Sequence, residues 1–358
     1  MSQQSAAKIS RPATDDRVIC DVVEAALGYQ AVLVAYDIKL FSTLDEGPMT
    51  LSEISQALGI AHRPARAILA VCVSLGLIDF KDDRYCLARV SEDYLLERNP
   101  TYAGAMLDFA IEQCRAPNTF DNLKKAVMTN RPQVYDGKSW VEIHQKQSEV
   151  ARNFTRLMHG HSLSAALVWP EAVDLTGCKT FLDIGGGSGA HSIGAALAWP
   201  NLQAITFDIA SVCEVAEDYI ASYELQDRIR AQVGNMWNDI FPPSDIHFYS
   251  DIYHDWPPER CHALTEKSFA SLEPGGRIII HEMLYNDDEV GPFTVAACGI
   301  EMLLWNEGQQ FSGGQLSAML AEAGFVDIEV KPTFGYWSIV TGRKPHSSAR
   351  NEINYSKR

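Results

Sequence analysis

An imidazole and a carboxylate stand side by side where an apolar stretch of this sequence ends. Residues 246–250 read IHFYS, and His254 and Asp255 follow shortly before two prolines. A histidine side chain, with a pKa of about 6.5, is both neutral and basic near neutral pH. Such a pair at the end of a predicted strand is either a solvated turn or a general base beside an acid. The surrounding motifs must decide between these two interpretations.

A glycine-rich loop precedes this pair in the chain. Residues 181–189 read FLDIGGGSG, after a strand-like segment and before a helix-like one. Gly185, Gly187 and Gly189 let the backbone turn tightly and approach a ligand closely, and the helix that follows directs its N–H groups toward that ligand. The alternating glycines differ from the G-x-G-x-x-G fingerprint of dinucleotide sites. The loop therefore predicts a nucleotide-type site, with a dinucleotide site and a ligand-free turn as the alternatives.

Two acidic residues near this loop indicate which nucleotide it binds. Asp183 precedes the glycines, where a buried carboxylate would repel a pyrophosphate but attract a cation such as a sulfonium that carries an α-amino group. Asp208 ends the next strand-like run, 19 residues after Gly189, and is placed to accept hydrogen bonds from ribose hydroxyls. S-adenosylmethionine is therefore the favoured ligand.

The elements that must position these groups form a repeating pattern from about residue 171 to 343. Apolar strand-like runs alternate with helix-like segments, which predicts an α/β domain with a doubly wound, mostly parallel sheet. Such sheets bind ligands at the carboxyl ends of their strands, where the residues above fall. The last two runs, within 324–343, are joined by a tight Phe-Gly turn and predict an antiparallel hairpin at the edge of the sheet.

The region before residue 116 is mainly helical. Thr50 and Glu53 have the spacing of a capping box at the start of a helix, and Gly59 ends that helix. A second helix follows over 62–75, and then two short strands around residues 81–84. This order predicts a winged-helix unit. A packing or dimerisation role is favoured over DNA binding, because acidic side chains surround the few basic ones.

Length, composition and charge narrow the class of protein. The 358 residues are enough for two or three domains. The formal charge of −16 disfavours nucleic acid and anionic membranes as partners. No apolar run approaches the length of a membrane-spanning helix, the start lacks a secretory signal, and eight scattered cysteines suit a reducing cytoplasm. We expect disordered tails at 1–15 and 344–358, a winged-helix dimerisation domain over 16–115, a helical linker that contributes to the substrate pocket over 116–170, and a cofactor-binding domain over 171–343.

The motifs together resemble those of the plant-type small-molecule O-methyltransferases, which include caffeate, hydroxyindole and bacterial polyketide or phenazine methyltransferases. The resemblance spans roughly residues 17–342. It implies a class I methyltransferase with a Rossmann-like sheet, S-adenosylmethionine as cofactor, S-adenosylhomocysteine as product, and a homodimer formed through the N-terminal domain. Besides the helical N-terminal half, it rests on FTRLMHGHS (154–162), LDIGGGSGA (182–190), FDIASV (207–212), VGNMW (233–237), YHDW (253–256), HEMLY (281–285) and NEGQQFS (306–312).

The resemblance also implies which residues hold the cofactor. The family uses the glycine loop and the acid after the second strand of the sheet, here Asp208. An Asp-Met pair brackets the adenine in the family, and this chain has Asn235 and Met236 there. Asn235 can still meet the exocyclic amine through its carbonyl oxygen. Ser250 stands where plant members have a lysine near the cofactor carboxylate. The full expected set is Asp183, Gly185, Gly187, Asp208, Asn235, Met236, Ser250 and Ser162.

For catalysis, the resemblance implies that His254 is the general base that removes the proton of a substrate hydroxyl. Glu282 matches the first of two glutamates that bracket this histidine in the family. Gln310 stands in the place of the second. A neutral amide orients the ring but does not stabilise an imidazolium by charge, so we expect a weaker base than in the plant enzymes. Asp255 can compensate, although its role in the family is mainly structural.

Gln310 leaves three functions open. The first is O-methylation of a small aromatic or polyketide-like natural product, the second is methyl transfer to carbon or nitrogen, and the third is a non-methylating reaction on the same scaffold. No metal is expected, because His144, His159, His161 and His191 lack ligand spacing on a single element. The residues that the resemblance assigns to the acceptor pocket are His144, Phe154, Met158, His161, Met302 and Asn306.

Overall fold

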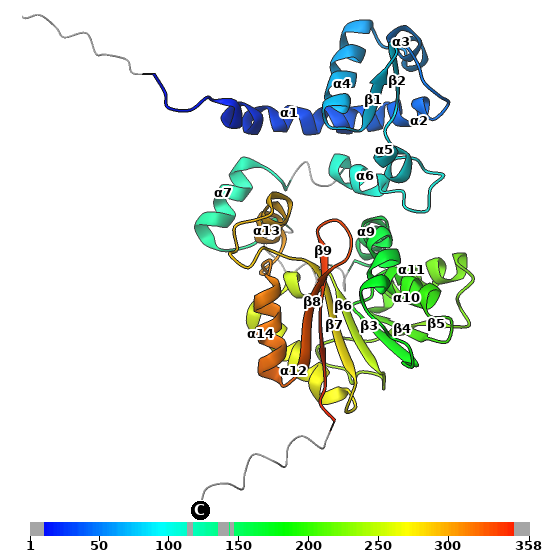
Figure 1. Ribbon diagram of the computed structural model, residues 1–358, viewed down its shortest axis with the longest axis vertical. Helices are drawn as coiled ribbons and strands as arrows, with labels where there is room; N and C mark the ends of the chain where they lie inside the picture. The colour runs from blue at the N-terminus through cyan, green and yellow to red at the C-terminus, as the bar shows by residue number, and fades with distance from the viewer. Residues whose placement is uncertain (1–10, 113–116, 135–142, 144–146, 347–358) are drawn as a thin grey trace, which may run out of the picture. The chain divides into compact units, whose positions relative to one another are not determined.

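The computed structural model describes residues 11–112, 117–134, 143 and 147–346 of the chain (Figure 1). The chain divides into two units, residues 1–107 and residues 108–358. This division lies a few residues before the domain boundary expected at 115, which stays a prediction. Both expected tails fall largely outside the described residues.

The first unit contains the elements that the sequence indicated between residues 50 and 88. Thr50 accepts a hydrogen bond from the Glu53 N–H, and the Glu53 carboxylate accepts one from the Thr50 N–H at 2.7 Å, which confirms the capping box. Gly59 ends the helix in the left-handed conformation, as predicted. In chain order, the helices and strands of the whole first unit are α1 (Arg17–Asp37), α2 (Leu40–Leu44), α3 (Leu51–Leu58), α4 (His62–Ser74), β1 (Ile78–Lys81), β2 (Arg84–Leu87) and α5 (Arg89–Tyr94). Helix α6 (Gly104–Glu112) follows them across the division between the units.

Helix α1 differs from the expectation for this region. Its 21 residues are long and apolar enough to cross a membrane by length and composition alone, so the prediction that no apolar run approaches that length is wrong. Its few charged residues are too widely spaced to interrupt the apolar character. Length and composition equally fit a helix whose apolar side is covered by another protein surface. Seven of its large apolar side chains are exposed within this chain: Val18, Ile19, Val22, Val23, Leu27, Tyr29 and Val34.

The second unit is built on one seven-stranded sheet, which confirms the predicted α/β class. Five strands run parallel, and the last strand of the chain runs antiparallel to both of its neighbours, as predicted for the final hairpin. The strands in spatial order are β5 (Ile229–Val233), β4 (Gln203–Asp208), β3 (Thr180–Ile184), β6 (Ile246–Ser250), β7 (Arg277–Met283), β9 (Trp337–Arg343) and β8 (Val326–Pro332).

Helices cover both faces of this sheet (Figure 1). One layer consists of α9 (Ser148–Val168), α10 (Ala190–Ala198) and α11 (Ala210–Ser222), and the other contains α12 (Pro258–Ser271) and α14 (Gly313–Ala323). Two short 3-10 turns, η2 (Trp169–Ala172) and η3 (Tyr253–Asp255), follow α9 and β6. Helices α7 (Phe120–Thr129) and α13 (Phe293–Trp305) pack against each other.

The strands alternate their side chains between two buried clusters, as the two-residue period of a strand requires. In β7, Ile278 and Ile280 join the cluster on the α12–α14 side, while Ile279 joins the cluster on the α9–α11 side. Tyr249 and Phe248 of β6 divide in the same way. Apolar packing on both faces holds the strands in place, and the strands in turn fix the ends of the turns that follow them.

The capping box offers a direct test of the local structure in the first unit. Thr50→Ala removes the side-chain acceptor for the Glu53 N–H, so we expect the free energy of unfolding, measured in urea, to fall by about 1 kcal/mol. Ser74→Ala is the matched control, because the Ser74 hydroxyl is exposed and donates only to the Val71 carbonyl within α4. Its effect should stay within about 0.5 kcal/mol. Equal losses in both variants would contradict the role of the cap.

Candidate active site

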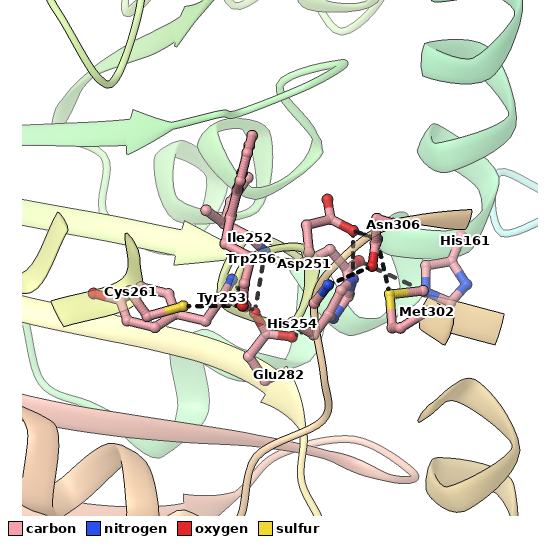
Figure 2. A network of polar contacts seen from close by, with 12 residues as sticks. His161, Asp251, Ile252, Tyr253, His254, Trp256, Cys261, Glu282, Met302 and Asn306 are labelled. Atoms are coloured by element: carbon pink, nitrogen blue, oxygen red, sulfur yellow. Dashed lines mark hydrogen bonds and ion pairs between the residues drawn. The ribbon is translucent and has the colours of Figure 1, made fainter. Parts of the chain in front are cut away.

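Glu282 joins β7 to the turn that follows β6. Its Oε1 atom accepts hydrogen bonds from the backbone N–H groups of Ile252 and Tyr253, at 3.0 and 2.9 Å. Its Oε2 atom lies 2.7 Å from Nδ1 of His254 (Figure 2). The carboxylate is buried, and both oxygens are in use. One side chain therefore holds both the backbone and the imidazole of the turn.

The bond to Glu282 determines which ring nitrogen of His254 is available for chemistry. A carboxylate accepts a proton, so Nδ1 is the donor, and in the neutral ring Nε2 carries the lone pair. Burial by itself lowers the pKa of His254, but the charges of Glu282, Asp255 and Asp251 outweigh it and raise the pKa to about 10. The family resemblance implied a weakened base with Glu282 as its charged partner and Asp255 as a residue that can compensate. The structure instead surrounds the ring with three carboxylates.

Asp255 is held between His254 and the segment after α13. Its Oδ1 atom lies 3.6 Å from His254 Nε2 and accepts a hydrogen bond from Asn306 Nδ2 at 2.8 Å. The Asn306 amide oxygen in turn accepts the Gly308 N–H at 2.9 Å. A Cβ atom at Gly308 would collide with the backbone carbonyl of His254, so only glycine lets this segment approach the turn. Asn306 thus supports Asp255, and its predicted contact with the acceptor stays a prediction.

Asp251 is a site residue that the sequence reasoning missed. It directly follows β6, and its carboxylate lies 3.7 Å from His254 Nδ1 and 3.6 Å from His161 Nε2 (Figure 2). Burial raises the pKa of Asp251 to about 7 and lowers that of His161 to about 4. The signal available in the sequence was its position, three residues before His254 at the end of a predicted parallel strand.

The glycine loop has the backbone conformation that the sequence predicted. Gly185, Gly187 and Gly189 all have positive φ angles, 69°, 56° and 77°. A Cβ atom at Gly185 would also collide with the Ile252 side chain. The loop is tied to the neighbouring strand, because the Gly187 N–H donates to Oδ2 of Asp208 at 3.0 Å. Burial raises the pKa of Asp208 to about 6.

Asp183 lies beneath this loop and is turned toward α10. Its Oδ2 atom accepts hydrogen bonds from the Ser192 N–H at 3.1 Å and from the Ser192 hydroxyl at 2.8 Å. Burial raises the pKa of the Asp183 carboxyl to about 7. In this structure the carboxylate therefore holds the loop to the helix, and a direct contact with a ligand stays a prediction.

The residues expected around an adenine lie in the turn after β5. The Asn235 amide oxygen accepts the N–H groups of Trp237 and Asn238, at 2.8 and 3.3 Å. Both lone pairs of that oxygen are thus engaged in the turn, so a contact with an adenine amine requires a different orientation of the side chain. Met236 packs against the cluster of apolar residues on the α12–α14 side.

Ser250 ends β6 and meets another residue absent from the predicted site. Its hydroxyl lies 3.1 Å from Nδ1 of His281, whose Nε2 lies 3.1 Å from the Thr333 hydroxyl. The His281 ring also stacks on Trp337, with ring centroids 4.7 Å apart. Burial holds the pKa of His281 well below its ordinary value. Ser250 is therefore paired with a neutral imidazole in this structure.

The expected acceptor residues lie mainly on α9 and α13. Phe154, Met158, His161 and Ser162 belong to α9, and Ser162 is buried. The Phe154 ring contacts Phe109, which in turn contacts Trp305 of α13. Met302 also belongs to α13, and its sulfur lies 3.2 Å from Asn306 Nδ2. His144 lies outside the described residues.

Gln310 is buried, and within the described part of the chain its Oε1 atom has no hydrogen-bond partner. The described structure also gives no hydrogen bond between Gln310 and His254, so the expected orienting bond stays a prediction. The network around His254 instead comprises Glu282, Asp255 and Asp251, with Asn306, Met302 and His161 at its edge (Figure 2).

Three of these residues have ligand types that also bind metal ions. Single donor atoms of Asp251, His254 and Glu282 all lie within 4.8 Å of one another. The 2.7 Å separation of His254 Nδ1 and Glu282 Oε2 is, however, that of a charge-assisted hydrogen bond. Two atoms bound to one divalent ion at about 2.1 Å each normally stand farther apart. The geometry therefore favours a proton between them, and the expected absence of a metal stays a prediction.

Two known proteins that are similar over most of this chain are O-methyltransferases. A 3-hydroxy-5-methyl-1-naphthoate 3-O-methyltransferase of Streptomyces sahachiroi is 28% identical over 87% of this chain and 90% of its own length. The tetracenomycin polyketide synthesis 8-O-methyltransferase of Streptomyces glaucescens is 27% identical over 91% of this chain and 96% of its own length.

Solved structures show the same fold. The human N-acetylserotonin methyltransferase in complex with S-adenosylmethionine superposes with a TM-score of 0.78, with 23% identity over 94% of this chain and all of that chain. The mitomycin 7-O-methyltransferase superposes with a TM-score of 0.73, with 22% identity over 92% of this chain and 97% of that chain.

Family models match both units of the chain. The model of an O-methyltransferase dimerisation domain matches residues 20–97, within the first unit. The model of the O-methyltransferase domain matches residues 120–326, which include the glycine loop, Asp208, His254, Glu282 and Gln310. The chain therefore belongs to the S-adenosylmethionine-dependent O-methyltransferases with an N-terminal dimerisation domain.

Proposed function

We propose that this methyltransferase acts on a hydroxyl group of a small aromatic or polyketide-like molecule, with His254 as the general base. The observation that carries the proposal is the 2.7 Å bond between Nδ1 of His254 and buried Glu282. That bond leaves Nε2 to accept the hydroxyl proton, at the end of the parallel strands where such sheets bind ligands. Glu282 then stabilises the imidazolium that forms.

The residues present fit S-adenosylmethionine. The positive φ angles of Gly185, Gly187 and Gly189 make a tight loop at the carboxyl end of β3, and Asp251 has a buried oxygen without a hydrogen-bond partner among the described residues, which suits a nearby cation. In this assignment the glycine loop and Asp183 line the cofactor site and Asp208 accepts from the ribose. Asn235 and Met236 bracket the adenine, while Ser250 and Ser162 approach the amino-acid end. When bound, the cofactor supplies a methyl group activated by its positively charged sulfur.

The positive charge of the bound cofactor explains how a histidine with a raised pKa can act as a base. A pKa of about 10 keeps His254 protonated at neutral pH in the free protein. A positive charge placed nearby disfavours the imidazolium and lowers that pKa toward neutrality. Negative side chains around the ring then stabilise the proton once it has been taken from the acceptor. Binding and proton transfer are thus linked through one cluster of charges.

The acceptor class is supported by the side chains on the acceptor side and by the relatives. Phe154, Met158 and Met302 offer apolar and polarisable surface that suits a flat ring, and His161 offers a polar contact. One of the two Streptomyces relatives is named for methylation of a naphthoate, and the other for polyketide synthesis. Transfer to carbon or nitrogen and a non-methylating reaction are the other outcomes that product analysis distinguishes.

His254→Asn tests the role of the base. The asparagine amide can still donate to Glu282 but has no basic nitrogen, so we expect turnover with a phenolic acceptor to fall by roughly 10²–10⁴-fold. Calorimetry should show unchanged binding of S-adenosylhomocysteine. The control is His262→Asn, which removes an exposed histidine of α12 that pairs only weakly with Glu322, 3.6 Å away. Undiminished turnover in His254→Asn would remove His254 from its role.

Asp208→Asn tests the cofactor site. The amide keeps one acceptor for the loop but loses the charge that strengthens hydrogen bonds to ribose hydroxyls, so we expect affinity for S-adenosylhomocysteine to drop roughly tenfold or more. Isothermal calorimetry measures this directly. Asp218→Asn, an exposed change on α11, should leave the affinity unaltered. Loss of binding in both variants would point to a general charge effect and contradict the assignment.

We also propose that two copies of the chain associate through the first unit. The dimerisation family model and the exposed apolar side chains of α1 support this. The double change Val22→Glu and Leu27→Glu places charges on that helix, so light scattering after gel filtration should show a single chain instead of a dimer. Ile240→Glu alters an exposed apolar residue of the second unit and should leave the mass unchanged. A wild-type protein that elutes as one chain would refute the proposal.

A further inference from the structure

Asp251 occupies an unusual position in the backbone. It lies one residue beyond β6, and its φ angle of 54° falls in the left-handed region that few residues other than glycine adopt. Aspartate and asparagine tolerate this conformation better than other side chains. The conformation directs the carboxylate toward the ring of His254 rather than along the strand (Figure 2).

The two oxygens of this carboxylate face two histidines from different elements. Oδ1 lies 3.7 Å from Nδ1 of His254, and Oδ2 lies 3.6 Å from Nε2 of His161, on α9. These distances are those of ion pairs and not of direct hydrogen bonds. Oδ2 is buried and has no hydrogen-bond partner among the described residues. A buried carboxylate without such partners is costly unless a neighbouring group carries a positive charge.

The other carboxylates around His254 already accept hydrogen bonds from neighbouring groups. Glu282 uses one oxygen for the backbone and the other for His254, and Asp255 accepts from Asn306. Gln310 is neutral, and its Oε1 atom has no hydrogen-bond partner among the described residues. Asp251 Oδ2 is thus the carboxylate oxygen near His254 that is buried without a hydrogen-bond partner among the described residues.

The pKa values agree with this geometry. The charge of Asp251 adds to those of Glu282 and Asp255 in raising the pKa of His254. Burial raises the pKa of Asp251, and the charge of His254 opposes that shift. Within the described part of the chain, the other titratable groups that interact electrostatically with His254 are Asp255, Glu282, His161 of α9 and Glu301 of α13. Cys298 of α13 also interacts with Asp251. Burial raises the pKa of Glu301, while His161 and His254 oppose that shift.

We propose that Asp251 is the second carboxylate partner of the catalytic base, in place of the glutamate that the family resemblance implies at residue 310, and that it links His254 to His161. The proposal rests on the methyl-transfer function above. Asp251 is a positioning residue in this role: it stabilises the imidazolium and holds His161 on the acceptor side, without taking the proton itself. The neutral Gln310 is then tolerated, because Asp251 supplies the negative charge that a glutamate at residue 310 would have supplied.

The test is the pKa of His254 in the full-length free protein, followed by NMR with labelled histidine. The resonance is identified by its absence from the His254→Asn spectrum. Asp251→Asn retains the left-handed backbone and removes the charge, so we expect the pKa of His254 to fall by about one unit or more. Asp218→Asn serves as the control and should leave it unchanged. A pKa unaltered by Asp251→Asn would overturn the proposal.

The pH–rate profile is a second measurement, and a purely structural role of Asp251 would not shift its acid limb. In Asp251→Asn the acid limb of the pH–rate profile should shift toward lower pH, because the base loses its proton more easily, and the plateau rate should fall roughly tenfold. A lower plateau without any shift of the limb would indicate damage to the fold and contradict the proposal.

Folding of the variants is checked by thermal denaturation, and Asp251→Gly is a second charge-free variant whose backbone suits the same φ angle. The two hypotheses fail in different ways. If no acceptor is methylated but the NMR titration shifts as expected, the proposed function fails and the pairing stands. If His254→Asn abolishes methylation while Asp251→Asn leaves the titration unchanged, only the pairing fails.

Discussion

The site depends on a buried carboxylate that does two things at once. Glu282 accepts the backbone N–H groups of Ile252 and Tyr253 with one oxygen and the imidazole of His254 with the other. Glu282 belongs to β7, an interior strand that is packed on both faces of the sheet. Its hydrogen bonds therefore fix the turn after β6 to a well-packed part of the structure. Unpaired backbone N–H groups and an unpaired carboxylate in this place would each be costly. Loss of Glu282 would therefore disturb the backbone of the turn as well as the base.

Around this anchor the protein concentrates negative charge. Asp251, Asp255 and Glu282 surround one histidine and raise its pKa, and Glu301 of α13 interacts electrostatically with the same ring. Such a cluster is unfavourable by itself, because like charges in a poorly solvated place repel each other. A cationic cofactor and a transient imidazolium both relieve that repulsion. The electrostatics thus agree with a site whose ligand carries a positive charge and whose reaction releases a proton.

The first unit contributes in a different way. Its α1 helix exposes apolar side chains that this chain alone does not cover, and a dimerisation family model matches this unit. Apolar surface of this kind is unusual for an isolated domain and typical of one that meets a partner. The N-terminal unit therefore has the features of an assembly domain, while the sheet and its turns carry the residues that we propose for chemistry.

Much of the molecule followed from local patterns in the sequence. Strand and helix periodicity gave the α/β sheet and its final hairpin, and the spacing of Thr50 and Glu53 gave the capping box, because these features depend on neighbours within a few residues. The left-handed glycines of the loop were likewise visible as residue types. The pairing of His254 with Glu282 came from the family resemblance, since 28 residues separate them and no local rule connects the two.

Other features were decided only by tertiary structure. Asp183 turns to Ser192 instead of lying open, and the Asn235 amide is used within its own turn. The role that we propose for Asp251 depends on a single φ angle and on α9, which brings His161 to its other side. The sequence determined which groups exist and where the strands end. Packing of distant elements determined which of those groups face each other, because electrostatic and hydrogen-bond partners are set by separation in space and not along the chain.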